Sequence, residues 1–288
     1  MGYQDHLHQL TGLGRPIDVR EGSNLVAVLG SAVIGALIFI GTWIADGSPD
    51  LIVSVAGAIG GFLSWAIARE LDPDRTQVAN LALVAGGLFA LAGPPALLVA
   101  GVALLAFRVI VNSVGTDLRP VDWVVLLAAA AYAGTTAIGW LISLALVFGV
   151  GRRPDRPRWL PPLMAAASIA TAVLVAGVPE PGVPGTGVSV ALLTTLIIGM
   201  WRSRAATVTS RSDSGTRSIQ ATDVSVARLA AVAVLAFGAI LAPETAGTAL
   251  GPIVASTLAL AVPCRSKVAG AAPADSRSAE VAEAAAQR

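Results

Sequence analysis

Residues 69–75 hold the densest cluster of charged side chains in this chain of 288 residues. The three carboxylates of the cluster, Glu70, Asp72 and Asp74, stand at alternate positions between two long apolar segments. Carboxylate oxygens are the ligands that Mg²⁺ prefers, and bound Mg²⁺ commonly bridges a few carboxylates to the phosphates of a substrate. The pattern therefore indicates Glu70, Asp72 and Asp74 as candidate magnesium ligands. The alternative is a structural turn, in which Pro73 ends one helix and the charges face water.

A second polar segment, residues 112–122, follows the next long apolar stretch, and Arg108 lies just before it. Two such loops on one side of a membrane could hold a phosphate-bearing substrate, so Arg108, Asn112 and Asp117 are candidate substrate-binding residues. Arg108 and Arg228 are the only basic residues inside the predicted membrane spans. Both lie near the ends of their spans, so the alternative role for each is a guanidinium that reaches the lipid headgroups.

Neutral hydroxyls provide the remaining candidates, of which Thr135 and Thr136 are the most prominent because they interrupt an apolar stretch. They are candidate substrate-binding residues on a permeation path, and the alternative is ordinary hydrogen bonding between helices. No Asp, Glu, His or Lys lies deep in a predicted span, which argues against a proton relay. The chain also contains no nucleotide-binding loop or hydrolase motif in a suitable setting, so transport driven by its own nucleotide site is not expected.

The composition indicates which elements must position these residues. The chain is 55% hydrophobic and 13% charged. Soluble domains are about 45–50% apolar and about 25% charged. The formal net charge of +1 and the lack of a basic stripe argue against a nucleic-acid partner. A single cysteine, Cys264, excludes an intrachain disulfide. The sequence predicts an all-α, polytopic transmembrane helix bundle whose main partner is the lipid bilayer.

A span needs about 20 mainly apolar residues to cross about 30 Å of hydrocarbon, and proline and glycine mark where spans end. The predicted transmembrane domain, residues 25–262, lies between a cytoplasmic tail of residues 1–24 and a disordered cytoplasmic tail of residues 263–288. Its predicted spans lie near residues 25–45, 51–68, 77–92, 95–112, 121–133, 137–151, 159–178, 186–201, 224–242 and 246–262.

The placement of basic residues favours ten short spans with both termini in the cytoplasm. Arginine and lysine accumulate in cytoplasmic loops. If residues 121–151 form a hairpin, all nineteen basic residues lie in cytoplasmic segments or near cytoplasmic helix ends. The alternative for 121–151 is one long tilted helix. A topology of eight spans, in which 77–112 does not cross twice, misplaces only Arg119.

The tails and loops are too short and too polar to form a soluble catalytic domain. The best functional hypothesis is a small-molecule permease in the cytoplasmic membrane, because a broken hairpin and abundant small residues are typical of cavity-lining bundles. One alternative is a membrane-embedded enzyme that processes a lipid or isoprenoid diphosphate, with Mg²⁺ on the acidic loop. The other is a membrane scaffold without catalytic activity. Enzymatic activity is the less favoured class.

Overall fold

The computed structural model describes residues 11–14, 17–93, 95–136, 138–176, 186–205, 207–215, 217–241 and 249–263. Ten α-helices and one π-helical turn lie in these residues, together with a single isolated bridge between Arg211 and Ser218. The all-α prediction is confirmed for this part of the chain. Most of the two predicted tails lies outside it.

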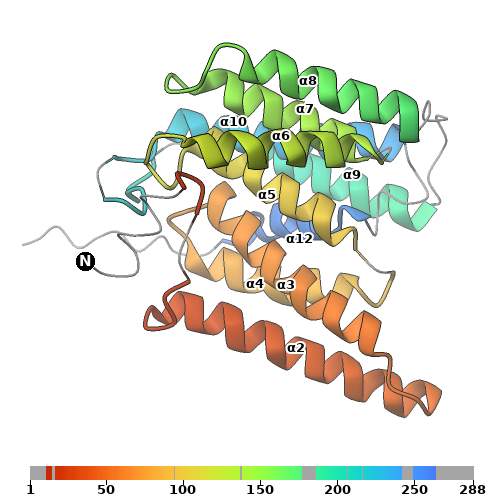
Figure 1. Cartoon of the computed structure of the whole chain (residues 1–288). Coiled ribbons are helices and arrows are strands. Elements are labelled where there is room, and N and C mark those ends of the chain that lie inside the picture. Colours follow the sequence, from red (N-terminus) through yellow and green to blue (C-terminus); the bar gives the residue numbers. More distant parts are fainter. Residues whose placement is uncertain are drawn as a thin grey trace, which may run out of the picture.

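The helices run side by side along one common direction, so that their ends form two opposite faces of a bundle (Figure 1). They are α2 (Gly22–Asp46), α3 (Leu51–Leu71), α4 (Thr76–Phe89), α5 (Leu97–Val111), α6 (Pro120–Gly134), α7 (Gly139–Arg152), α8 (Leu160–Thr171), α9 (Thr186–Trp201), α10 (Ala221–Leu241) and α12 (Gly251–Ala259). The π-helical turn η1 (Ala172–Ala176) continues α8.

Local sequence signals explain where several helices begin and end. Gly47 ends α2 in the left-handed conformation, with φ of 72°, and its amide donates to the carbonyl of Trp43. The carboxylate of Asp50 accepts a hydrogen bond of 2.9 Å from the amide of Val53 and so caps α3. A helix overlaps each of the ten predicted spans, and α12 begins at Gly251 with a proline in its first turn.

Residues 121–151 form two helices, α6 and α7, that pack against each other, so the hairpin interpretation of this stretch is confirmed. The predicted break near residue 93 is confirmed as well, because α4 ends at Phe89 and α5 begins at Leu97. Three helices, α2, α3 and α10, are long and apolar enough to cross a membrane by themselves. Five shorter apolar helices accompany them in the described residues.

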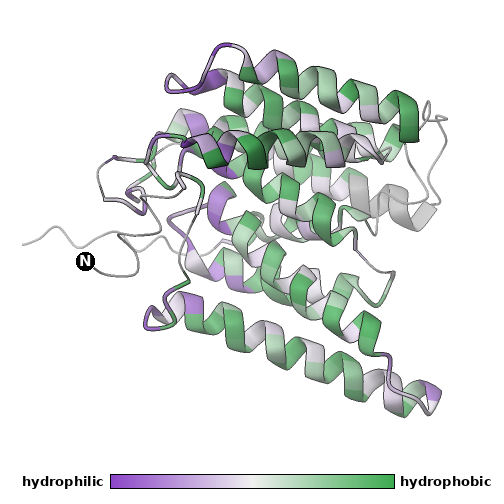
Figure 2. Cartoon of the chain, viewed as in Figure 1, coloured by the Kyte–Doolittle hydropathy of each residue, from purple (hydrophilic) through white to green (hydrophobic). Residues whose placement is uncertain are grey.

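Large apolar side chains cover the outside of the bundle. Leu37 is 62% exposed, Ile44 is 80% exposed and Leu174 is 82% exposed. Hydrophobic residues extend along the helices, whereas hydrophilic residues gather at their ends (Figure 2). An exposed apolar surface of this extent is rare on soluble monomers and marks a surface that contacts lipid or protein. The chain is therefore a multi-pass helical protein with a surface suited to lipid contact.

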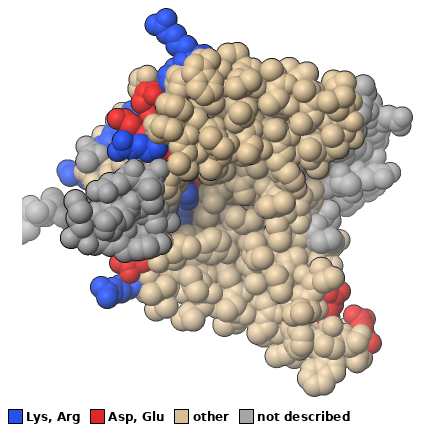
Figure 3. Space-filling model, viewed as in Figure 1, with Lys and Arg blue, Asp and Glu red and all other residues tan. Residues whose placement is uncertain are grey.

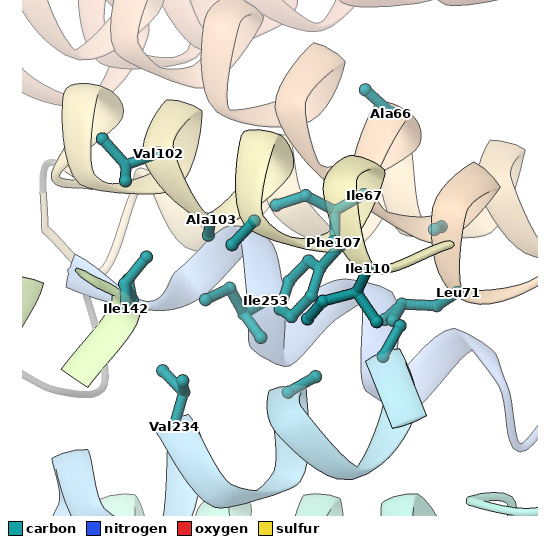
Figure 4. Close-up of a cluster of buried hydrophobic side chains, with 14 of the residues drawn as sticks. Ala66, Ile67, Leu71, Val102, Ala103, Phe107, Ile110, Ile142, Val234 and Ile253 are labelled. Atoms are coloured by element: carbon teal, nitrogen blue, oxygen red, sulfur yellow. The ribbon is translucent and has the colours of Figure 1, made fainter. Parts of the chain in front are cut away.

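The core of the bundle surrounds α5. Figure 4 shows Phe107 and Ile110 of α5 directed toward Ile67 of α3 and Ile253 of α12, with Val234 of α10 on the far side. All five side chains are buried. One helix thus organises the packing of elements that are far apart in the sequence, and it carries the candidate arginine of the site one position beyond Phe107.

Glycines bring α3 and α4 into close contact. A methyl group built on Gly61 would lie 2.9 Å from the carbonyl oxygen of Leu83, closer than real carbon atoms approach. A methyl group on Gly57 would lie 3.3 Å from the carbonyl oxygen of Gly87. Gly57 and Gly61 therefore allow α3 and α4 to pack closely, as small residues do between membrane helices.

Candidate functional site

Arginine side chains gather at one end of the bundle, which we call the basic end (Figure 3). Every arginine of the described residues lies in a loop at this end or within about two helical turns of it. The opposite end carries Asp46 and Asp50 in the turn between α2 and α3. The bundle is therefore strongly polarised in charge, although the net charge of the chain is +1.

Glu70 forms a buried ion pair with Arg108 at the basic end. Glu70 is 1% exposed, and its Oε1 accepts a bond of 3.1 Å from Nε of Arg108. Nη1 of the same guanidinium donates to the carbonyl oxygen of Leu13, also at 3.1 Å. The pair joins α3 to α5, while Oε2 of Glu70 is buried without a hydrogen-bond partner among the described residues.

Asp72 has different partners from Glu70. Its carboxylate pairs with Arg75 and lies 3.6 Å from Nη2 of Arg228, which enters from α10. Arg228 also donates to the carbonyl oxygens of Leu71 at 2.7 Å and Arg202 at 2.8 Å. This buried guanidinium therefore ties α10 to the end of α3 and to the end of α9.

Asp74 holds the loop that follows α9. Its carboxylate accepts bonds of 2.9 Å from the amides of Thr209 and Ser210 and one of 2.6 Å from the hydroxyl of Ser210. Partial burial raises the pKa of Asp74, but the hydrogen bonds from the Ser210 hydroxyl and the two amides outweigh it and hold the pKa below its usual value.

The three candidate magnesium ligands thus face three sets of partners. No group of three or more His, Cys, Asp or Glu side chains within the described ranges is placed to hold a metal ion. Glu70, Asp72 and Asp74 instead bind guanidiniums and amides of α5, α10 and the 203–220 loop. Magnesium binding at this loop stays a prediction that the arrangement does not support.

Asn112 ends α5 in the left-handed conformation, with φ of 55°. Its side-chain oxygen accepts from Nη1 of Arg153, and Nη2 of the same guanidinium donates to the Thr116 carbonyl oxygen at 2.8 Å and to Asp155 at 2.9 Å. Burial raises the pKa of Asp155, but the hydrogen bond and charge of Arg153, with the Leu118 amide at 2.6 Å, lower it below its usual value. Asn112 therefore belongs to a rigid corner between α5 and α7.

An amino-terminal segment, residues 11–14, crosses the basic end, and we call it the strap. The Asp122 carboxylate accepts from the hydroxyl of Thr11 and, at 2.7 Å, from the amide of Gly12. Leu13 is buried in the core. Sequence reasoning missed this element, and an isolated leucine between glycines is the only signal that could have indicated it.

Thr135 and Thr136 form the turn between α6 and α7 at the opposite end. The Thr135 hydroxyl donates to the carbonyl oxygen of Tyr132 at 2.7 Å, and the Thr136 hydroxyl accepts from the amide of Gly139 at 3.0 Å. The last residue of α6 lies directly against Ser168 and Thr171 of α8, just before the π-helical turn. Hydroxyl groups therefore concentrate where three helices end or change their geometry.

The candidate substrate-binding residues fall into two groups. Arg108 and Asn112 lie together at the basic end of α5, with the exposed Asp117 in the loop that follows. Thr135 and Thr136 lie at the other end of α6. The structure does not bring the five residues together into one pocket.

The described residues line several cavities of different character. A groove of about 470 Å³ between α7 and α10 has apolar walls that include Leu144, Phe148 and Phe237. A cavity of about 160 Å³ at the basic end contains Trp65 and Arg108 among its walls. Of these two, only the second combines apolar walls with charged groups, which is the usual character of a ligand site.

Comparison with protein families, with curated proteins and with solved structures gives no match. The fold and the distribution of charge define the chain as a multi-pass helical membrane protein.

Proposed function

We propose that this chain is a small-molecule permease of the cytoplasmic membrane, in which ten helices cross the bilayer and both termini face the cytoplasm. The gathering of arginines at the basic end supports this orientation, because cytoplasmic loops are enriched in arginine and lysine. The exposed apolar side chains of α2 and α8 support contact with lipid.

The observation that carries the transport proposal is the short length of α6 and α7, which meet in a turn. Helix α6 has 15 residues and α7 has 14 residues. Helices of that length rise about 21–22 Å, whereas the hydrocarbon layer is about 30 Å thick. If the basic ends of α6 and α7 lie at one surface of the hydrocarbon layer, their turn lies inside the layer and does not reach the other surface. Figure 1 shows that α2 extends further than α6 toward that other side. Irregular backbone at membrane depth is tolerated only where protein or water shields it, so we take this turn as the floor of a water-filled recess.

The residues around that turn favour an uncharged substrate. Thr135, Thr136, Ser168 and Thr171 offer hydroxyl groups, which hydrogen-bond to polar solutes but do not neutralise a charge. The carboxylates at the basic end are engaged with guanidiniums and amides, which gives the diphosphate-processing alternative less support. A small polar, uncharged solute is therefore the substrate class that fits best.

Thiol labelling tests the recess. In a Cys264→Ser background, Thr136→Cys should react with a charged, membrane-impermeant thiol reagent added from outside. Leu37→Cys is the control of matched depth, because Leu37 lies about as far from the basic end of α2 as Thr136 lies from the basic end of α6. Leu37 faces outward, at 62% exposure, so its cysteine should be covered by lipid and stay unlabelled. Protection of both cysteines would contradict the recess.

Transport itself is tested by the swelling of proteoliposomes in a panel of uncharged polyols, sugars and amides. Entry of at least one solute should be faster than in empty liposomes, and Thr135→Val should slow it. Thr42→Val is the matched control, because its hydroxyl makes the same kind of bond, to the carbonyl oxygen of Phe39 at 3.1 Å. Equal rates with and without protein for every solute would favour the scaffold alternative.

A further inference from the structure

The cavity of about 160 Å³ at the basic end lies where α2, α3 and α5 approach one another. Its walls include Asn24, Phe62, Trp65, Arg69, Leu104 and Arg108. Pockets for drug-sized ligands are larger, at about 300–1,000 Å³. The space therefore suits a single polar group with a short apolar extension.

The polar part of the wall consists mainly of hydrogen-bond donors. Trp65 is 5% exposed, and its indole Nε1–H is buried without an acceptor in the described part of the chain. Arg69 lies over the Trp65 ring, 5.8 Å from its centre, and its Nη1 donates to Thr76 at 3.3 Å. Arg108 uses Nε and Nη1 for Glu70 and Leu13, so its Nη2 can serve a further acceptor.

The charge of this wall favours an anion. Arg69 and Arg108 both contribute guanidinium groups to this wall, and Glu70 is paired with Arg108. A buried donor without an acceptor is costly, so an anionic oxygen placed against the Trp65 indole would relieve that cost. Guanidinium groups bind phosphate oxygens with particular strength.

Polarity changes with depth along the cavity. An α-helix rises about 1.5 Å per residue. Counted from the end of α3, Arg69 therefore lies about 3 Å deep, Trp65 about 9 Å and Phe62 about 13 Å. On α5, Arg108 lies about 4 Å from the helix end and Leu104 about 10 Å. The order of charge, then indole, then hydrocarbon follows the order of headgroup, interface and acyl chain in a lipid leaflet.

We propose that this cavity binds the phosphate group of an anionic glycerophospholipid in the leaflet at the basic end. The phosphate lies between Arg69, Arg108 and the Trp65 indole, and the first carbons of the chains contact Phe62 and Leu104. Basic pockets between transmembrane helices bind anionic headgroups in this manner. The site stands on its own geometry, whether or not the chain transports a solute.

The test uses the full chain, purified in a non-ionic detergent and titrated with soluble short-chain lipids. Dihexanoyl phosphatidylglycerol should raise the Tm in a saturable manner, because a ligand that binds the folded state stabilises it. Dihexanoyl phosphatidylcholine, whose ammonium group would face two guanidiniums, and inorganic phosphate, which lacks the apolar part, should require at least about tenfold higher concentrations.

Two pairs of variants locate the site. Trp65→Phe keeps the ring but removes the indole donor, and it should weaken phosphatidylglycerol binding about tenfold. Trp123→Phe is its matched control, because the Trp123 Nε1 is also buried without a partner among the described residues but lies outside the cavity. Arg69→Gln should weaken binding at least about tenfold. Arg152→Gln should not, although Arg152 lies over the Phe148 ring at the same distance of 5.8 Å.

Several results would overturn the proposal. Equal binding by Trp65→Phe and Trp123→Phe would place the lipid elsewhere. Equal affinity for phosphatidylcholine would remove the anionic requirement, and equal affinity for inorganic phosphate would remove the lipid. If Arg69→Gln fails to fold, Arg69→Lys keeps the charge without the planar donors and should still bind less tightly than the wild type.

Discussion

Breaking the buried pair of Glu70 and Arg108 should cost far more than losing one surface contact. Arg108→Leu leaves the carboxylate of Glu70, only 1% exposed, without its guanidinium, while its second oxygen already lacks a partner in the described residues. Removing one member of a buried ion pair costs about 3–5 kcal/mol. We therefore expect the free energy of unfolding to fall by about that amount in Arg108→Leu.

The double variant Glu70→Leu with Arg108→Leu separates this penalty from the intrinsic value of the pair. It buries no charge at these positions, so its stability should lie within about 2 kcal/mol of the wild type. The measurement is unfolding in mixtures of a mild detergent and dodecyl sulfate, with circular dichroism as the readout. The matched surface pair is Arg152 and Asp223, which are 2.7 Å apart with Arg152 40% exposed. Arg152→Leu should cost less than about 1 kcal/mol.

Additivity would refute this reasoning. If the double variant lost as much stability as the two single variants together, the two side chains would not be energetically coupled. A cost below about 1 kcal/mol for Arg108→Leu would show that water reaches Glu70 in the folded protein.

Three further predictions concern packing, pH and the strap. Gly61→Ala should lower the free energy of unfolding by about 1–3 kcal/mol in the dodecyl sulfate assay, whereas Gly101→Ala, with open space around it, should be neutral or stabilising. The pKa of Asp74 is lowered in the folded state, so the ionised carboxylate stabilises the protein above the unfolded pKa near 3.8, and this stabilisation is lost as the pH falls through the folded pKa. Asp74→Asn should therefore flatten the decline of Tm below about pH 4. An unchanged decline would contradict this prediction. Asp122→Ala should release residues 11–14 and speed their amide hydrogen exchange at least about tenfold, without a comparable change in α10.

The helices could be predicted from the sequence because a single physical requirement determines them. Within lipid every backbone amide and carbonyl must be satisfied inside its own segment, so long apolar stretches become helices and breakers divide them. The predicted 51–68 corresponds to Leu51–Leu71, and 77–92 corresponds to Thr76–Phe89. Remaining differences at the ends depend on caps such as the left-handed Asn112, which apolar patterning does not encode.

The site could not be predicted in the same way, because residues that are close in the sequence do not necessarily have side chains that meet in space. Glu70 and Asp72 are two residues apart at a helix end, where successive side chains turn by about 100°, so they point in nearly opposite directions. Their partners, Arg108 and Arg228, come from other helices. Asp74 binds a loop far along the chain, a pairing that no local pattern reveals.

The same arginines carry two kinds of information in this chain. Their positive charge determines which end of each helix stays at the cytoplasmic side in the proposed topology, and any basic residue would serve that purpose. Their planar guanidinium groups also join helices, since Arg228 reaches two carbonyl oxygens and a carboxylate at once, which a lysine ammonium on a flexible stem does not reproduce. This second requirement favours arginine over lysine at the bridging positions, such as Arg108, Arg153 and Arg228. Glu70, Asp72, Asp155 and Asp223 pair with these guanidiniums and so offset part of the positive charge at the basic end.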